Sequence, residues 1–345
     1  MNIEGSEPSK KVLVVAEIGN NHEGNFDTAQ RMIASAAKAG ADAVKLQTII
    51  PEQLVHCSDT ARLERLRGFQ FSFAQFEALA RTARDSGVIF FSTPFDLQSA
   101  RFLNSIQNVF KIASGDNNFM QLIQCVAAFS KPMFVSTGLA DLALLQRIYS
   151  ATSAIWNKNG VNPGFAFLHC VCSYPAPPDQ ANLGAIQKLK AHFPGAIIGY
   201  SDHTLGIEAA TFAVAAGARI IEKHFTLDKN HSEFRDHQLS ADPQDFRLLV
   251  SSIRRVEAMQ GSCEITPQAC EEGNRAPVRR SIAAAQDLAA GTKLTDAHIT
   301  WVRPGTGIPP GEEHTVRGRV TKRSLVQGEI ITIEDFTETG INRST

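Results

Sequence analysis

The sequence predicts an α/β protein in which a (β/α)8 TIM barrel is followed by a small β-rich domain. Short apolar runs rich in β-branched residues alternate with amphipathic stretches, and this rhythm repeats eight times over roughly 250 residues, as such a barrel requires. No Gly-x-Gly-x-x-Gly turn follows any of these runs, which disfavours a dinucleotide-binding doubly wound sheet. Beyond residue 260 the sequence becomes polar and rich in turn residues, which indicates a second, smaller domain.

The eight predicted strands occupy residues 12–18, 43–47, 88–92, 110–113, 133–136, 165–171, 196–200 and 219–224. The first helix is predicted over 26–38, where apolar residues recur near helical spacing until Gly40 ends the pattern. A longer insertion over 51–70 separates the second strand from a helix predicted over 73–85. The last helix of the barrel is predicted over 245–259.

The sequence predicts a barrel domain over 1–260, a linker over 261–277 and a β-rich domain over 278–345. Prolines, glycine and polar residues indicate the linker. Within the last domain, 291–295 with Ile299 matches 328–332 with Phe336 at identical spacing. A duplicated β-rich module fits this repeat, and a module of that size buries little core on its own.

Composition argues against several classes of partner and location. The 34 Lys and Arg residues balance 35 Asp and Glu residues, so neither nucleic acid nor an anionic membrane is an expected partner. No apolar run reaches the roughly 18 residues of a transmembrane helix, and the polar start does not resemble a signal peptide, so we expect a cytoplasmic protein. Six cysteines in 345 residues favour reduced thiols. Cys170 and Cys172 fit strand alternation better than a redox or zinc pair.

Polar residues stand at or just after the ends of the predicted strands. They are Glu17, Lys45, Gln47, Thr93, Lys111, Ser114, Asp116, Ser136, Cys172, Tyr174, Ser201, His203, Glu222 and His224. The carboxyl ends of barrel strands converge at one rim, where the chemistry of such folds is found. A barrel held together by apolar layers has no structural use for this set, so the sequence predicts a site there.

Two kinds of chemistry can be separated within the set. The lysines, four hydroxyls and the backbone N–H groups around Gly138 suit a phosphate and a carboxylate on one small ligand. The side chains in this group are Lys45, Thr93, Lys111, Ser114, Ser136 and Ser201. His203 and His224 end neighbouring strands, with Asp202, Glu222 and Asp236 nearby, and predict a divalent metal site. Two imidazoles leave coordination positions open, which suits Mn2+ better than a structural zinc.

Eight short motifs occur in order: 16–22 (AEIGNNH), 45–48 (KLQT), 92–95 (STPF), 111–115 (KIASG), 136–138 (STG), 174–177 (YPAP), 200–204 (YSDHT) and 222–226 (EKHFT). With them the chain resembles the sialic acid synthases, the N-acylneuraminate synthase family, over nearly its whole length. The segment 303–308 (RPGTGI) resembles the C-terminal antifreeze-like (SAF) domain of that family. The resemblance implies condensation of phosphoenolpyruvate with an N-acylated hexosamine, giving a nine-carbon 3-deoxy-ulosonic acid and phosphate.

The resemblance also implies roles for matching positions. Phosphoenolpyruvate binding falls to Lys45, Thr93, Lys111, Ser114, Ser136, Cys172 and Ser201. The implied catalytic residues are Glu17, Asp116, His203 and His224, and the two histidines are the implied ligands of a divalent ion, expected to be Mn2+ with Mg2+ or Co2+ as alternatives. The sugar falls to Glu17, Asp116, Tyr174, Asp236 and Arg303, and Arg303 would reach the barrel of a partner subunit in a domain-swapped homodimer.

Two positions and one segment depart from the family pattern. Cys172 stands where an Asn helps to bind phosphoenolpyruvate, and Asp116 stands where the acid is a longer Glu. The segment 234–237 (FRDH) replaces a Pro-Gly-Pro-Asp-like turn, which suggests a sugar pocket of altered shape. Because the family has an amide at position 172, Cys172 is predicted to be a tolerant position and not a catalytic thiol.

The sequence leaves alternatives open. The acceptor could be N-acetylmannosamine, its 6-phosphate or a diacetamido-trideoxy-hexose. Another phosphoenolpyruvate-dependent 3-deoxy-ulosonic acid phosphate synthase is a competing interpretation, although the SAF-like segment speaks against it. A non-catalytic phosphosugar sensor on the same fold is the alternative from a different class, and retention of both lysines and both histidines speaks against that.

Overall fold

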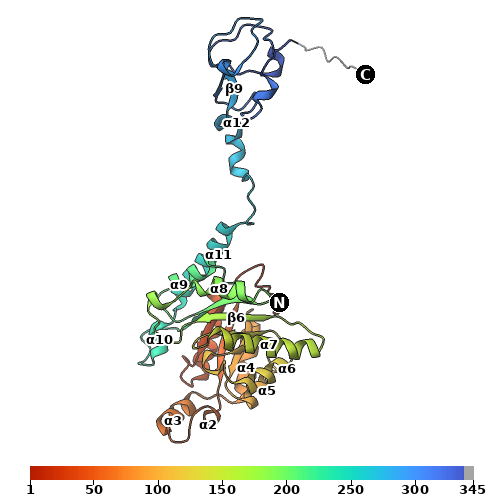
Figure 1. Cartoon of the computed structure of the whole chain (residues 1–345). Helices are drawn as coiled ribbons and strands as arrows, with labels where there is room; N and C mark the ends of the chain where they lie inside the picture. The colour runs from red at the N-terminus through yellow and green to blue at the C-terminus, as the bar shows by residue number, and fades with distance from the viewer. Residues whose placement is uncertain (338–345) are drawn as a thin grey trace. The chain divides into compact units, whose positions relative to one another are not determined.

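The structure is a computed structural model that describes residues 1–337, so the final part of the predicted β-rich domain, 338–345, lies outside the described residues. It consists of two compact units, Met1–Ser262 and a second unit that begins at Cys263 (Figure 1). The helices of the first unit surround its strands, as Figure 1 shows. No helix of residues 1–337 is long and apolar enough to cross a membrane.

The first unit contains eight parallel strands, which confirms the predicted barrel. They are β1 (Leu13–Gly19), β2 (Ala43–Thr48), β3 (Ile89–Pro94), β4 (Phe110–Ile112), β5 (Met133–Ser136), β6 (Phe165–Cys170), β7 (Ile197–Asp202) and β8 (Ile220–His224). The order is β3-β2-β1-β8-β7-β6-β5-β4, and the end strands β3 and β4 contact each other. At this seam the Gln107 amide accepts from the Ser92 N–H at 2.7 Å and donates to the Ser92 carbonyl at 3.2 Å. One side chain thus satisfies backbone groups of β3 beside the seam.

The inward-facing positions of the strands change character along the barrel. Near the amino ends they form an apolar cluster of Leu13, Val15, Ala43, Ile89, Phe91, Val109, Phe134, Ala166, Leu168 and Ile220. Side chains of a strand alternate between faces, so the next inward position lies two residues further on. Those positions hold Glu17, Lys45, Thr93, Lys111, Ser136, Cys170 and Glu222. Ile3 also packs in the apolar cluster, so the N-terminal segment covers the end of the barrel away from these polar residues.

The helices around the strands are α1 (Phe26–Lys38), α4 (Phe73–Asp85), α5 (Leu97–Leu103), α6 (Met120–Ala128), α7 (Leu142–Lys158), α8 (Ala185–His192), α9 (Glu208–Ala215) and α11 (Pro243–Gln260). Their apolar faces and the outward faces of the strands form the largest core cluster. The predicted insertion contains two helices, α2 (Pro51–Leu54) and α3 (Thr60–Phe69), which project from the barrel in Figure 1. A further short helix, α10 (Arg235–Leu239), follows β8.

The second unit is small and rich in turns. Its antiparallel pair, β9 (Ser281–Ala284) and β10 (Ile299–Val302), packs over an apolar cluster that includes Leu294, Ile331 and Phe336. The two copies of the predicted repeat have the same local structure. Thr295 and Thr332 each cap a 3-10 turn, and the apolar residue before each of them is buried. The segment predicted as linker is exposed but contains two short helical segments, Ala269–Asn274 and Arg275–Val278.

Candidate functional site

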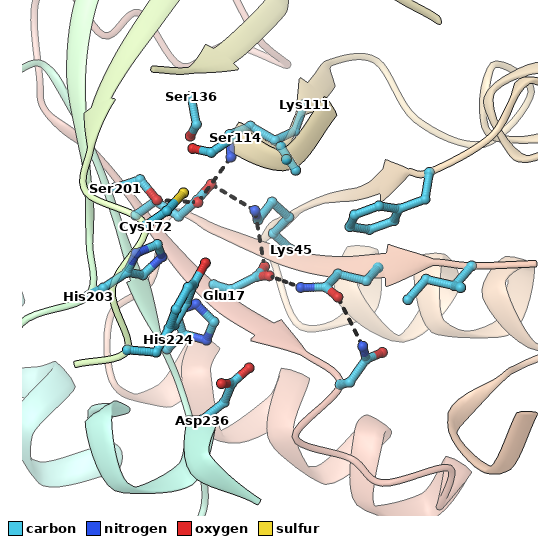
Figure 2. A pocket seen from close by; sticks show the side chains of 18 of the residues that line it. Glu17, Lys45, Lys111, Ser114, Ser136, Cys172, Ser201, His203, His224 and Asp236 are labelled. Atoms are coloured by element: carbon cyan, nitrogen blue, oxygen red, sulfur yellow. Dashed lines mark hydrogen bonds and ion pairs between the residues drawn. The ribbon is translucent and has the colours of Figure 1, made fainter. Parts of the chain in front are cut away.

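A cavity of about 410 Å³ lies at the carboxyl ends of the barrel strands (Figure 2). Most of the predicted site residues line it: Glu17, Lys45, Lys111, Ser114, Ser136, Cys172, Tyr174, Ser201, His203, His224 and Asp236. Within the described chain, Thr93 and Asp116 are not among the lining residues, and Arg303 belongs to the second unit. Side chains from strands far apart in sequence therefore meet at one rim.

Glu222 connects both lysines on the floor of this cavity. Its carboxylate lies 3.1 Å from the Lys45 ammonium and 3.2 Å from the Lys111 ammonium, and it accepts the Ser201 hydroxyl at 2.8 Å. Burial alone would raise the pKa of Glu222, but Lys111 and Lys45 hold it well below its ordinary value. Glu222 is thus a fixed counter-charge for both buried ammonium groups. The arrangement can accept an anion that approaches from the open side of the cavity.

Glu17 continues this network toward the mouth of the cavity. It lies 3.4 Å from Lys45, and it accepts a hydrogen bond from the Gln47 amide at 2.9 Å, which in turn accepts from Asn20 at 2.9 Å (Figure 2). Burial raises the pKa of Glu17 to about 7, although the attraction of Lys45 opposes this. A carboxyl group with this pKa can take up or release a proton near neutral pH.

The two predicted metal ligands face each other across the rim. The ring centroids of His203 and His224 are 5.3 Å apart, and the Tyr174 ring packs at a tilt against His203, with centroids 4.1 Å apart. The Nδ1 atom of His203 donates to the Val171 carbonyl at 2.8 Å, which leaves Nε2 with a free lone pair. The buried Nδ1 of His224 has no hydrogen-bond partner among the described residues.

Burial keeps both imidazoles uncharged. It lowers the pKa of His203 to about 4 and holds the pKa of His224 well below its ordinary value. A metal ligand must be a neutral imidazole, so the two rings fit a divalent ion. The described residues contain no group of three or more His, Cys, Asp or Glu side chains placed to hold a metal, so water or substrate oxygens would complete the coordination.

Two of the predicted hydroxyls have no partner in the described chain. The buried Thr93 Oγ1 and Ser136 Oγ atoms lack a hydrogen bond, which normally requires a ligand or water to satisfy them. Ser114 Oγ accepts the backbone N–H of Gly138 at 3.1 Å. A Cβ atom at Gly138 would lie 2.5 Å from the Cys172 sulfur and 2.7 Å from Ser114 Oγ, so only glycine fits this close approach.

Cys172 lies half-buried beside Cys170 in the cavity wall. A hydrogen bond from Cys170 lowers the pKa of Cys172 to about 6, while the pKa of Cys170 is raised well above its ordinary value. The Cys172 thiol is therefore more acidic than an ordinary cysteine thiol. Its predicted tolerance to substitution stays a prediction.

Asp116 occupies a 3-10 turn, Ser114–Asp116, that follows β4. Burial raises its pKa to about 6, and the buried Oδ2 atom has no partner in the described chain. Its neighbours Ser114 and Gly115 line the cavity, so the turn borders the cavity although Asp116 does not line it.

Two carboxylates that the sequence placed near the predicted metal site have other roles in the structure. Glu222 binds the lysines, as described above. Asp202 receives hydrogen bonds from Thr204 at 2.8 Å and from the Lys223 ammonium at 2.9 Å, and it does not line the cavity. The alternation of strand residues could have shown this difference, because position 222 faces inward with 220 and 224, whereas 202 lies on the opposite face from 201.

The cavity is also lined by residues that the sequence did not predict: Ile49, Leu54, Arg62, Arg65, Leu66, Phe69 and Phe95. Phe234, from the segment expected to alter the sugar pocket, lines it too. Most of these residues belong to the insertion after β2. Phe69, at the end of α3, contacts Phe234 with ring centroids 5.4 Å apart. The helical spacing of residues 62, 65, 66 and 69 was a signal that the insertion presents one face to the site.

Comparisons with known proteins agree with this geometry. A model of the NeuB family matches residues 32–264, and a model of the SAF domain matches residues 279–337. An N,N'-diacetyllegionaminic acid synthase of Legionella pneumophila is 36% identical, over 94% of this chain and 96% of its own. An N-acetylneuraminate-9-phosphate synthase of Mus musculus is 33% identical, over 89% of this chain and 88% of its own.

Solved structures show the same relationship. The crystal structure of an N-acetylneuraminic acid (sialic acid) synthetase from Leptospira borgpetersenii, in complex with citrate, is 35% identical and has a TM-score of 0.72. The match covers 76% of this chain and 90% of the other.

Proposed function

The chain belongs to the NeuB family and is an enzyme of the N-acylneuraminate synthase kind, and from this premise we propose that it condenses phosphoenolpyruvate with an N-acylated amino sugar. The products would be a nine-carbon 3-deoxy-ulosonic acid and phosphate. One observation carries the proposal. Two buried lysines, which both pair with Glu222, line the same cavity as two neutral imidazoles.

The inner end of the cavity would bind phosphoenolpyruvate. Lys45 and Lys111 supply the positive charge for its phosphate and carboxylate, and the free hydroxyl of Ser136, which lines the cavity, can donate to its oxygens. Glu222 holds the two ammonium groups in place before the ligand arrives, so little reorganisation is needed on binding. The enzyme can then stabilise the phosphate as it leaves with additional charge.

His203 and His224 would hold a divalent ion beside this position. Such an ion would act as a Lewis acid toward the aldehyde oxygen of the acceptor, which makes the aldehyde electrophilic enough for the weakly nucleophilic C3 of phosphoenolpyruvate. Tyr174 packs against both imidazoles, with ring centroids 4.1 Å and 6.1 Å away, and would fix their orientation.

Glu17 would handle the proton of the water that adds at C2. Its Oε1 is held by Gln47, and its Oε2 faces Lys45 at the centre of the cavity. Water addition after carbon–carbon bond formation gives a tetrahedral carbon that expels phosphate, and an ionised Glu17 would accept the proton of that water. We assign Asp116 to the acceptor side, because its turn borders the cavity and its carboxyl group is near ionisation at neutral pH.

Arg303 would contribute from a partner subunit. It follows β10 of the SAF domain and its side chain is exposed there. A planar guanidinium can donate several hydrogen bonds to sugar hydroxyl or acyl oxygens at once. The homodimer that this requires is part of the proposal.

The test is release of inorganic phosphate from phosphoenolpyruvate by the full-length enzyme with Mn2+ and a panel of N-acyl amino sugars. We expect release only when both substrates are present, and Lys111→Met should raise the KM for phosphoenolpyruvate. Exposed Arg67→Gln serves as the matched control with unchanged kinetics. Absence of release with every acceptor, from folded and metal-loaded enzyme, would overturn the proposal.

A further inference from the structure

We propose that Arg62 and Arg65 form a second anionic subsite at the mouth of the cavity, which selects an acceptor sugar phosphorylated at the end away from its aldehyde. This inference rests on the proposed condensation and names the class of acceptor. It starts from α3, the helix of the insertion after β2, whose role in the site was not foreseen from the sequence.

Helix α3 turns one face toward the cavity. Arg62, Arg65, Leu66 and Phe69 all line the cavity, and their spacing of three, four and seven residues puts them on one face of the helix. The helix is anchored at its start, where the Asp59 side chain accepts the Arg62 backbone N–H at 3.2 Å.

Apolar contacts also hold α3 in place. Leu63 and Leu66 pack in a small buried cluster with Ile49 and Val55, and Phe69 packs against it. The helix is therefore attached to the rim by its own core, and the two arginines project from a fixed base. This arrangement differs from that of basic residues on a surface loop.

The basic residues of the cavity differ in whether they have a counter-charge. Lys45 and Lys111, at the inner end, already have Glu17 and Glu222 as counter-charges. Within the described chain, neither Arg62 nor Arg65 has an ion-pair partner. Arg67, on the same helix but away from the cavity, pairs with Glu52 at 2.7 Å. The mouth thus presents two uncompensated guanidinium groups, which a ligand anion can neutralise.

The spacing of Arg62 and Arg65 suits a phosphate group. Arginines three residues apart on a helix have Cβ atoms about 5–6 Å apart, a separation at which both guanidinium groups can bind one phosphate group. Each guanidinium is a planar fork that matches phosphate oxygens. A phosphate dianion would satisfy both arginines.

The position of the subsite identifies the substrate that carries this phosphate. The acceptor aldehyde has to face phosphoenolpyruvate and the imidazoles at the inner end, so the opposite end of the sugar points to the mouth. Phe69, Phe95 and Leu66 are apolar residues of the cavity wall that can contact the sugar ring. The mouth arginines would therefore bind a phosphate on the far end of the acceptor, separate from the phosphate of phosphoenolpyruvate.

The experiment compares N-acetylmannosamine with its 6-phosphate, and each further N-acyl amino sugar with its phosphate, at saturating phosphoenolpyruvate. We expect the wild-type kcat/KM to be at least about 10-fold higher for the phosphorylated member of a pair. Arg62→Gln and Arg65→Gln should each raise the KM for the phosphosugar about 10- to 100-fold, with the KM for phosphoenolpyruvate and the kinetics of the unphosphorylated sugar unchanged. Arg67→Gln, on the same helix, should change nothing.

A binding measurement keeps the inference testable without turnover. In calorimetry with chelator-treated full-length enzyme and phosphoenolpyruvate, N-acetylmannosamine 6-phosphate should bind more tightly than N-acetylmannosamine, and the Arg62→Gln, Arg65→Gln double variant should lose the difference. Equal affinities, a preference that survives in the double variant, or a raised KM for phosphoenolpyruvate in place of the sugar would overturn the subsite. Efficient turnover of unphosphorylated sugars alone would overturn it while the proposed condensation stands.

Discussion

Replacing Glu222 by Gln removes the charge that both buried lysines share while preserving the shape of the side chain. At an effective dielectric constant of about 20, each ion pair at 3.1–3.2 Å has a Coulomb energy of about 5 kcal/mol. Lys45 keeps Glu17 at 3.4 Å in the variant, so the deficit falls mainly on Lys111. Burial already lowers the pKa of Lys111 in the wild type, although Glu222 opposes this.

Proton release limits the cost of this substitution. Discharging a lysine with an ordinary pKa of about 10.4 at pH 8 costs about 3 kcal/mol, since each unit of pKa corresponds to 1.36 kcal/mol. We therefore expect Glu222→Gln to lower the free energy of unfolding by about 3 kcal/mol at pH 8, in the range known for broken buried pairs. Folding of the variant then releases a proton, so its stability relative to wild type should rise by about 1.4 kcal/mol per pH unit between pH 7 and 9.

The measurement is urea unfolding followed by the fluorescence of Trp156, which is buried in the barrel core, in a Trp301→Phe background. Inorganic phosphate should stabilise Glu222→Gln more than wild type, because the lysines gain an anion without competition from the carboxylate. Glu52→Gln, which removes an exposed partner of Arg67, is the matched control and should cost at most about 1 kcal/mol. A loss below about 1 kcal/mol at pH 7, or a loss independent of pH, would refute the reasoning.

Four further predictions follow from the site. His224→Ala should weaken Mn2+ binding in calorimetry and reduce turnover by orders of magnitude, and full wild-type activity in excess chelator would contradict this. Cys172→Ser should keep most activity, whereas complete inactivation together with turnover-dependent labelling of the wild-type thiol would show that Cys172 is a nucleophile. Asp116→Asn should be more stable than wild type at pH 7 but not below pH 4. Folding holds the pKa of the Asp116 carboxyl above its ordinary value, so the wild type loses stability as the pH rises to about 6, and the variant does not. Equal pH profiles of unfolding in the two proteins would be the contrary result. Mixing inactive Arg303→Ala and His203→Ala proteins should restore some activity through heterodimers, and heterodimers without activity would disprove a shared site.

The fold could be predicted because strand alternation and helix spacing act locally. The eight strands and the amphipathic helices between them follow from patterns of apolar residues, and barrel closure brings the strand ends together. The seam could not be predicted in this way, since the Gln107 side chain satisfies the Ser92 backbone groups through a contact specific to this structure. The helices of the insertion were not predicted, because only part of their apolar surface is buried and the pattern is weak.

The site was predicted as a set of residue types, and its pairings were not. Strand ends identify Lys45, Lys111 and the two histidines, but sequence alone cannot show that Glu222 lies between the lysines and not beside a metal. The fit of Arg62 to the cavity depends on how α3 packs on the rim, which its own sequence does not determine.

The central claim, condensation with loss of phosphate from C2 of phosphoenolpyruvate, is tested most directly by running the reaction in water enriched in oxygen-18. Water is proposed to add at C2, and the phosphate would leave with its original bridging oxygen. We therefore expect unlabelled inorganic phosphate, formed in equal amount to a product that has the composition of the acceptor plus pyruvate and carries one oxygen-18 atom from the water at C2. Phosphate that carries oxygen-18, or phosphate formed without a joined product, would show hydrolysis at phosphorus and contradict the account.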